Sequence, residues 1–195
     1  MRLCVATKNA HKLKEIRAIL SGLDVDVRSA YEFIENDFDV EETGATFEEN
    51  ASLKADALSA LVEGYVIADD SGLCVDALGG EPGIYSARYA GVNASDAENN
   101  ALLLKNTENI QDGRRAARFV CAIALSKNGT TERIFRGECE GMLGRAEKGA
   151  NGFGYDPLLV MPDGRSLAEY PPEEKNRISH RFRALELLRK YLAEK

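Results

Sequence analysis

Short apolar runs bounded by polar or glycine-containing turns recur along this chain. Residues 24–27 alternate polar and apolar side chains, which is typical of an exposed edge strand. The turn Lys127-Asn128-Gly129 separates two longer apolar segments and predicts a β-hairpin. Buried strands are expected at 3–6, 66–68, 118–125, 131–140 and 158–160.

Apolar residues change to helical spacing between several of these runs. Thr46 stands at the N-cap position of one such segment, and Glu49 three residues later completes a capping box. The pair Pro171-Pro172 is typical of a helix start. Helices are expected around 13–20, 47–61 and 93–106, with a further helix starting within 171–175 and a final helix after Ser179-His180-Arg181.

Two adjacent carboxylates, Asp69 and Asp70, follow the apolar run at 66–68 and precede the pair Ser71-Gly72. The pattern predicts a strand that ends at the two aspartates, where open α/β sheets bind ligands. Neighbouring side chains on a strand point to opposite faces, so one aspartate faces a site and the other has a structural role. A haloacid-dehalogenase phosphatase is excluded, because that class requires Asp-x-Asp.

The segment from Thr7 to Lys12 lies between the first strand and the first helix. Backbone N–H groups and the helix dipole at such a junction favour an anion. Thr7 and Asn9 add hydrogen-bond donors, and Lys8 and Lys12 add positive charge. A Walker loop is absent. Taken by itself, the segment is better explained as an ordinary capped helix with surface lysines.

The pair Glu41-Glu42 before Thr43-Gly44 could offer a carboxylate to a cation. Asn50 and Lys54 follow on one face of the next helix, at i and i+4. They are either solvent-facing or part of a site. Further on, in the segment 152–157, Gly152 and Gly154 precede Phe153 and Tyr155, and such glycines allow an exposed ring to stack on a nucleobase.

Composition narrows the class of protein. The 195 residues are 44% hydrophobic and 29% charged, which is enough for a sizeable core in one domain, residues 1–195, with two lobes possible. The formal net charge of -7 argues against binding polymeric nucleic acid or an anionic membrane. No run reaches transmembrane length, and the start of the chain lacks a signal-peptide pattern.

The four cysteines are widely spaced, and His11 and His180 are the only histidines. A tetrahedral zinc site and a disulfide framework are therefore not expected. Three of the cysteines lie in apolar runs and are predicted to be small core residues. A cytoplasmic location follows from this cysteine usage.

Taken together, these motifs resemble the inosine triphosphate pyrophosphatases, which act on non-standard purine nucleoside triphosphates such as ITP, dITP and XTP. They occur in that family's order over almost the whole chain. Lys8 is the clearest departure, because much of the family has glycine there. The motifs are Ala6-Thr7-Lys8-Asn9 with Lys12, Glu41-Glu42-Thr43-Gly44 with 47–54, Ala68-Asp69-Asp70-Ser71-Gly72-Leu73, 80–88, 152–157, Glu173-Glu174-Lys175 and Ser179-His180-Arg181.

The resemblance implies a two-lobed α/β fold around a long mixed sheet flanked by helices, with the substrate in a cleft between the lobes. It implies a Mg²⁺-dependent hydrolysis between the α- and β-phosphates that releases a nucleoside monophosphate and pyrophosphate and cleanses the nucleotide pool. A homodimer is expected as well.

By position, the resemblance gives each motif a role. Asp70 would bind magnesium together with Glu41 and act as the base toward water. Lys54 would contact a phosphate, and Ser71 the substrate. The triphosphate would be gripped by Thr7, Lys8, Asn9, Ala10, His11 and Lys12. The base pocket would consist of Phe153, Gly154, Tyr155, Asp156, Lys175, His180 and Arg181.

Within that pocket, Arg181 and a charged Lys175 offer only hydrogen-bond donors. Such donors suit the C6 oxygen of hypoxanthine or xanthine and meet another donor on adenine. The expected result is that ATP is spared.

Three other functions are weighed. A pyrophosphatase of related fold that prefers pyrimidine or modified nucleotides is disfavoured by the motifs at 153 and 179–181. A nucleotide-sensing module without turnover is disfavoured because Glu41 and Asp70 are both present. A generic α/β binding protein would leave the ordered motifs unexplained.

Overall fold

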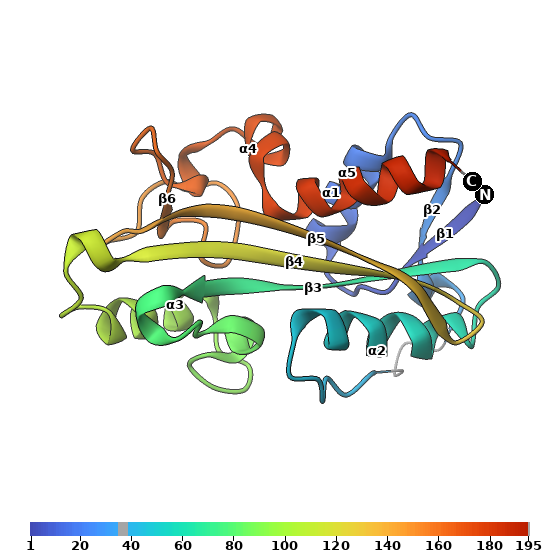
Figure 1. The fold of residues 1–195 in the computed structure, drawn as a ribbon, viewed down its shortest axis with the longest axis horizontal. Coiled ribbons are helices and arrows are strands. Elements are labelled where there is room, and N and C mark those ends of the chain that lie inside the picture. Colours follow the sequence, from blue (N-terminus) through green and yellow to red (C-terminus); the bar gives the residue numbers. More distant parts are fainter. Residues whose placement is uncertain (35–38, 195) are drawn as a thin grey trace. The chain divides into compact units, whose positions relative to one another are not determined.

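The computed structural model describes residues 1–34 and 39–194. These residues form one six-stranded mixed sheet in the order β2-β1-β3-β4-β5-β6. β1 pairs in parallel with β2 and β3, whereas β5 and β6 are antiparallel. The strands are β1 (Arg2–Val5), β2 (Asp26–Ser29), β3 (Tyr65–Val75), β4 (Ala116–Lys127), β5 (Thr130–Leu143) and β6 (Leu159–Val160). The sheet and its flanking helices confirm the predicted mixed α/β fold (Figure 1).

Five α-helices occur in the described part of the chain. They are α1 (Ala10–Leu20), α2 (Phe47–Ser59), α3 (Asp96–Asn106), α4 (Pro172–Ile178) and α5 (His180–Ala193). Short 3-10 helices connect other elements: Ala30–Glu32, Asp76–Leu78, Gly83–Arg88, Asp112–Arg114 and Leu167–Glu169. All the helices expected from the apolar spacing are therefore present.

The chain divides into two compact units. Unit 1 contains Met1–Asp70, Cys121–Gly137 and Arg181–Lys195, and unit 2 contains Ser71–Val120 and Glu138–His180. The boundaries fall inside β3, β4 and β5 and at the start of α5, so these three strands contribute residues to both units.

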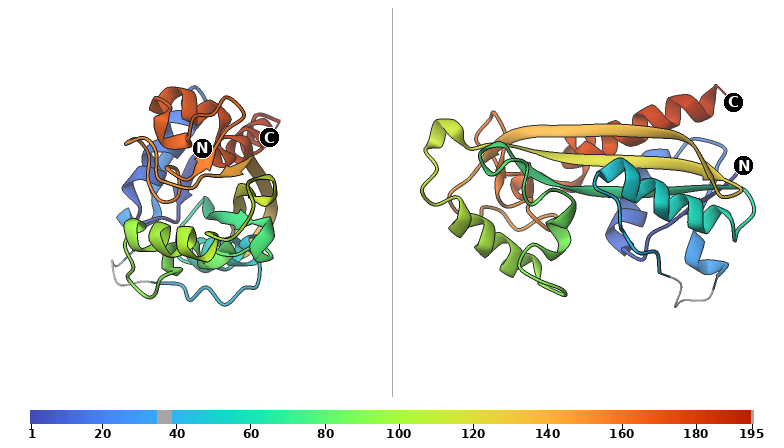
Figure 2. Two further views of the ribbon diagram at one scale, coloured as in Figure 1. Left: turned by 90° about the vertical axis from the view of Figure 1, so that its left-hand side faces the viewer. Right: turned by 60° about the horizontal axis from the view of Figure 1, so that its bottom comes forward.

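In unit 1, α1 and α5 lie on one face of the strands and α2 lies on the other (Figures 1 and 2). The core between the strands and the first pair of helices is apolar, because both helices present aliphatic side chains at helical spacing. Its buried members include Leu3, Ile16, Ile123, Leu185 and Leu188.

In unit 2, α3 and α4 lie on opposite sides of the strands (Figures 1 and 2). The core of this unit combines strand residues with aromatic side chains from the segments that follow β5. Leu73, Leu103, Phe119, Tyr155 and Leu167 are among its buried residues.

The hairpin between β4 and β5 is confirmed. Asn128 and Gly129 both have positive φ angles, 52° and 78°. Two consecutive residues of this kind form the tight turn whose twist matches paired antiparallel strands. The expected edge strand at 24–27 corresponds to β2, which lies at one edge of the sheet.

The prediction that the strand ends at Asp69 and Asp70 is wrong. β3 continues through both residues to Val75, and Ser71-Gly72 is not a turn. Gly72 is needed for close packing, because a Cβ atom there would collide with the carbonyl oxygen of Gly83 and with Ser86 Oγ. The Leu73 N–H donates to Ser86 Oγ over 2.9 Å at this contact.

Two smaller predictions have different outcomes. Cys4, Cys121 and Cys139 are buried thiols outside any disulfide, which confirms them as core residues. Thr46 caps α2 by accepting from the Glu49 N–H at 3.1 Å, as predicted. The prediction of a full capping box is wrong, because the Glu49 carboxylate accepts from the Ala45 N–H at 2.6 Å.

Among the described residues, no helix combines the length and the apolar character needed to cross a membrane.

Candidate functional site

Asp69 and Asp70 point to opposite faces of β3, as the strand pattern predicts. The Asp69 carboxylate accepts from Lys12 Nζ of α1 at 3.1 Å and from the guanidinium of Arg181 in α5 at 3.2 and 3.3 Å. The Asp70 carboxylate instead faces α2. Adjacent carboxylates therefore have separate partners within unit 1.

Asp69 is a neutralised, buried anion. Only 4% of it is exposed. Burial by itself would raise the pKa of Asp69, but the charges of Lys12 and then Arg181 outweigh burial and hold that pKa well below its usual range. Arg181 is 2% exposed and also pairs with Glu15 of α1. Asp69 therefore links α1 and α5 to the strand, which is the structural role expected of one member of the pair.

Asp70 has the opposite electrostatic character. It accepts from Asn50 Nδ2 and from Lys54 Nζ, both at 3.4 Å. Burial raises the pKa of Asp70; Lys54 opposes this rise, and Glu42 adds to it. A carboxylate with a raised pKa and long hydrogen bonds is suited to accept a proton.

Lys54 lies between two carboxylates. Its Nζ donates to Glu42 at 2.7 Å in addition to Asp70. Burial alone would lower the pKa of Lys54, but Asp70 and Glu42 raise it above its usual value. Lys54 is therefore a charged ammonium at neutral pH. Glu41, the predicted metal ligand, is exposed beside Glu42.

Asn50 is a site residue that the sequence analysis left open. It is fully buried. Its Oδ1 accepts from the Gly44 N–H at 2.8 Å while its amide donates to Asp70. The Glu41-Glu42-Thr43-Gly44 motif and Asp70 are thus joined through one side chain. The spacing of Asn50 and Lys54 was the signal, and their shared face is confirmed.

The segment from Thr7 to Lys12 forms the strand-to-helix junction that was predicted. Asn9 caps α1, and its Oδ1 accepts from the His11 and Lys12 N–H groups at 2.9 and 3.2 Å. Thr7 Oγ1 accepts from the Asn9 N–H at 3.1 Å. Ala10 begins the helix, and Lys8, Ala10 and His11 are exposed. A phosphate at this junction would share these N–H groups with Asn9.

The predicted base-pocket residues of unit 2 form a connected group. Asp156 Oδ2 accepts from the Phe153 N–H at 2.9 Å and from Lys175 Nζ at 2.6 Å. Lys175 Nζ also lies 4.8 Å from the centre of the Phe153 ring. Tyr155 donates its hydroxyl to the Ser86 carbonyl at 2.7 Å and is buried, so it supports the loop. Ser71 is half-buried in the part of β3 that belongs to unit 2.

His180 has an aromatic partner that sequence reasoning missed. Its ring stacks on Phe119 of β4, with centroids 4.8 Å apart and planes 14° from parallel. Both residues are 6% exposed. The apolar pattern of 118–125 indicated that Phe119 lies in a strand, but no local signal pairs it with a histidine 61 positions later.

The structure describes the predicted site residues as two groups, one in each unit. Thr7–Lys12, Glu41, Lys54, Asp70 and Arg181 belong to unit 1, whereas Ser71, Phe153–Asp156, Lys175 and His180 belong to unit 2. No cluster of three or more histidine, cysteine, aspartate or glutamate side chains arranged for a metal occurs among the described residues. The cleft between lobes stays a prediction.

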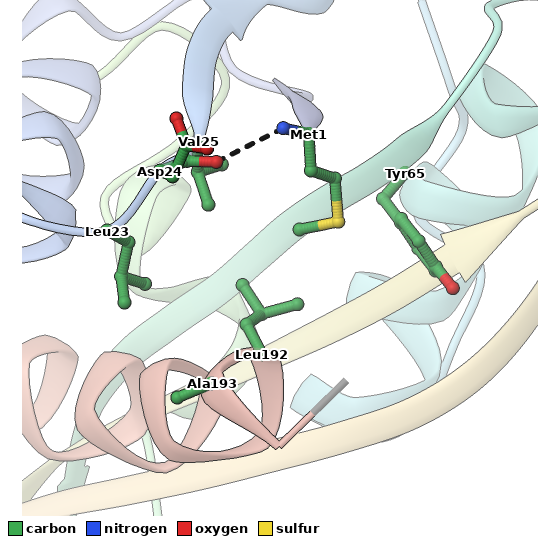
Figure 3. A pocket seen from close by; sticks show the side chains of 7 residues that line it. All are labelled: Met1, Leu23, Asp24, Val25, Tyr65, Leu192 and Ala193. Atoms are coloured by element: carbon green, nitrogen blue, oxygen red, sulfur yellow. Dashed lines mark hydrogen bonds between the residues drawn. The ribbon is translucent and has the colours of Figure 1, made fainter.

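A separate cavity of about 510 Å³ lies in unit 1 (Figure 3). Its lining is mostly apolar and includes Leu23, Val25, Tyr65 and Leu192. The N-terminal ammonium of Met1 donates to the Asp24 carbonyl at its edge over 3.1 Å. None of its lining residues is a predicted site residue.

Comparison with known proteins identifies the family. The model of the Ham1 family matches residues 3–191. The chain belongs to the Ham1 family. It is 47% identical over 194 residues to a dITP/XTP pyrophosphatase of Listeria innocua, covering 99% of this chain and 95% of the relative. It is 50% identical over 193 residues to a dITP/XTP pyrophosphatase of Geobacter sulfurreducens, covering 98% and 96%.

Solved structures of Ham1 proteins have the same fold. The Ham1 protein of Coxiella burnetii superposes with a TM-score of 0.92 at 42% identity, and both chains are fully covered. That of Staphylococcus aureus gives a TM-score of 0.90 at 44% identity, again with full coverage of both chains. The resemblance on which the sequence analysis relied is confirmed.

Proposed function

We propose that this protein hydrolyses dITP, ITP and XTP to the nucleoside monophosphate and pyrophosphate. The observation that carries the proposal is the environment of Asp70: a buried carboxylate that lies 3.4 Å from Lys54 Nζ and from Asn50 Nδ2. Membership of the Ham1 family, whose relatives include dITP/XTP pyrophosphatases, supports the substrate class. Removal of such nucleotides would cleanse the nucleotide pool.

Magnesium is the cofactor that the donor set fits. The carboxylates of Glu41 and Asp70 are hard oxygen donors, which Mg²⁺ prefers. Asp70 and Glu42 share a single lysine, Lys54, so this group of three side chains carries one excess negative charge that a divalent cation would offset. When bound, magnesium would polarise the phosphate oxygens and neutralise their charge.

The chain's own groups would carry the remaining chemistry. Asp70 takes a proton from the water whose oxygen attacks the α-phosphorus. The bond from that phosphorus to the bridging oxygen breaks, and pyrophosphate leaves. Lys54, which already contacts Asp70, offers a positive charge to a phosphate. Lys12 and the backbone of Thr7–Lys12 would hold the rest of the triphosphate.

Base selection is assigned to the group around Phe153. The ring stacks on a purine of any kind, so selection must come from polar groups at the edge of the base. Lys175 Nζ lies beside the ring and donates. Asp156 accepts hydrogen bonds from the Phe153 N–H and from Lys175 Nζ, and so fixes the position of the ring relative to the lysine. His180 would form part of the wall of the base pocket. Arg181 is ion-paired in unit 1, which favours a supporting role over direct contact with the base.

One assay tests the proposal. Purified protein is incubated with magnesium and, separately, dITP, ITP, XTP, GTP, ATP and dTTP in ¹⁸O-labelled water. We expect pyrophosphate from the first three, with the label in the monophosphate. Orthophosphate with a nucleoside diphosphate would show attack at the γ-phosphorus and contradict the assignment. A preference for dTTP would favour the pyrimidine alternative.

Three further properties are proposed on the resemblance and the composition: a homodimer, a cytoplasmic location and a single folding domain over residues 1–195. Sedimentation equilibrium tests the first, and cell fractionation the second. A single cooperative transition in calorimetry would support the third, because β3, β4 and β5 each contribute to both units. Two separate transitions would argue against it.

A further inference from the structure

We propose that Asp96 and Asn100 of α3 are positioning residues for base selectivity, because together they hold the peptide groups of Gly154 beside Phe153. The inference rests on the proposed function, in which Phe153 stacks on the purine. It assigns a role to a helix that none of the catalytic motifs includes.

The contacts are direct and lie within unit 2. The Gly154 N–H donates to Asp96 Oδ2 at 2.7 Å. Asn100 Nδ2 donates to the Gly154 carbonyl at 3.1 Å. Both polar backbone groups of one loop residue are thus bound by side chains of one helix. Gly154 has a φ of +61°, a left-handed conformation that glycine adopts without strain and few other residues do.

The start of α3 is fixed so that both side chains face the loop. Ser95 and Glu98 form a reciprocal capping box at its N-terminus. Asp96 and Asn100 are spaced i and i+4, and therefore lie on one face of the helix. The first-turn position of Asp96 also favours its negative charge through the helix dipole.

Asn100 has only one orientation that fits. Its partner on Gly154 is a carbonyl oxygen, so the amide nitrogen must face the loop. Asn100 is 3% exposed, and its Oδ1 is then buried without a hydrogen-bond partner among the described residues. An unpaired buried acceptor is unfavourable for folding. An apolar residue would avoid this, so the contact with Gly154 is the structural reason for an asparagine here.

The neighbouring Asn99 shows the difference. It is equally buried, at 2% exposure. Its Oδ1 accepts from the Ala90 N–H at 2.8 Å, and its Nδ2 donates to the Ala87 carbonyl at 3.2 Å. Asn99 therefore satisfies both of its polar groups on a different segment. It is a matched control for the loss of a buried amide.

The loop is consequently held from two sides. Asp156 binds the Phe153 N–H and Lys175, while α3 binds the next residue, Gly154. The position of the ring relative to Lys175 decides whether the base edge meets that donor. Without the α3 contacts the Phe153 ring could still stack, because stacking tolerates any base. The ring would no longer be held in a fixed position relative to Lys175.

The test compares Asp96→Ala and Asn100→Ala with the controls Glu98→Ala and Asn99→Ala. We expect kcat/KM for dITP to fall about tenfold and that for ATP about twofold in the first pair, since one charge-assisted or buried hydrogen bond corresponds to roughly a factor of ten. Both controls should lower Tm but leave the ratio of kcat/KM for dITP to kcat/KM for ATP at its wild-type value. Asp96 is exposed, so its variant is expected to fold even if Asn100→Ala does not.

A second readout does not depend on catalysis. The chain contains no tryptophan, so Phe153→Trp introduces a single fluorophore into the loop. Acrylamide quenching of its indole should increase when Asp96→Ala is added and stay unchanged with Glu98→Ala.

The outcomes separate the two proposals. The inference would be overturned if Asp96→Ala changed neither the dITP-to-ATP ratio of kcat/KM nor, in the Phe153→Trp background, the acrylamide quenching of the indole. Wild-type protein that fails to hydrolyse dITP would instead overturn the proposed function, while increased quenching would still support the role of α3 in fixing the loop.

Discussion

Asp69→Asn and Asp70→Asn are isosteric changes at adjacent positions of β3, and we expect them to impair different properties. Asp69 is 4% exposed and pairs with two positively charged side chains, Lys12 and Arg181. Asp70 has a raised pKa and faces Lys54. The first substitution should lower stability, and the second should lower turnover. Each variant is the control for the other.

The magnitude for Asp69→Asn follows from its ion pairs. Removing one partner of a buried pair costs about 3–5 kcal/mol, because an uncompensated charge remains. Arg181 keeps Glu15, and Lys12 is partly exposed, so the lower end applies. A loss of about 3 kcal/mol corresponds to a Tm lower by about 6–12 °C for a chain of this size. Turnover of the folded fraction should fall much less than in Asp70→Asn.

The magnitude for Asp70→Asn follows from the loss of the base. Removal of a general base lowers the rate by about 10²–10⁴, and the loss of a metal ligand adds to that. Stability should change little, within about 2 °C in Tm. Burial already disfavours the ionised Asp70, and Lys54 keeps Glu42 at 2.7 Å.

Two measurements decide the matter. Thermal unfolding is followed by circular dichroism in the presence of a chelator, and initial rates of pyrophosphate release from dITP are measured with magnesium at 20 °C below each variant's Tm. The reverse pattern, with Asp69→Asn inactive but as stable as the wild type, would refute the division of roles. Equal effects of the two substitutions on both properties would refute it too.

Three other predictions concern neighbouring residues. Lys12→Ala should raise KM for dITP and also lower Tm in thermal unfolding; an exposed lysine would affect KM alone, but Lys12 pairs with Asp69 at 3.1 Å. Arg181→Ala should lower Tm and reduce kcat/KM for dITP and ATP by similar factors, since the side chain is 2% exposed and ion-paired. A fall in kcat/KM for dITP alone would instead indicate that Arg181 contacts the edge of the base. Asn50→Leu should reduce kcat by about tenfold through the lost contact with Asp70, and an unchanged kcat would leave Asn50 as a core residue only.

Much of the fold could be predicted from local patterns. The hairpin at Asn128-Gly129, the cap at Thr46 and the apolar faces of the helices depend on interactions between residues close in sequence. The order of the motifs along the chain also indicated the family. Local signals failed at Ser71-Gly72, where a pair typical of a turn lies within a continuous strand, because close packing against Ser86 required a glycine.

The site divides in the same way. The sequence by itself placed Asp69 and Asp70 on opposite faces of one strand, since side chains alternate along any strand. Only the tertiary structure decided which face is which: Asp69 meets Arg181, 112 positions later, while Asp70 meets Lys54 of α2. Burial and the charges gathered around each carboxylate set its pKa, and these depend on which helices cover the two faces of the sheet. No pattern along the chain contains that information.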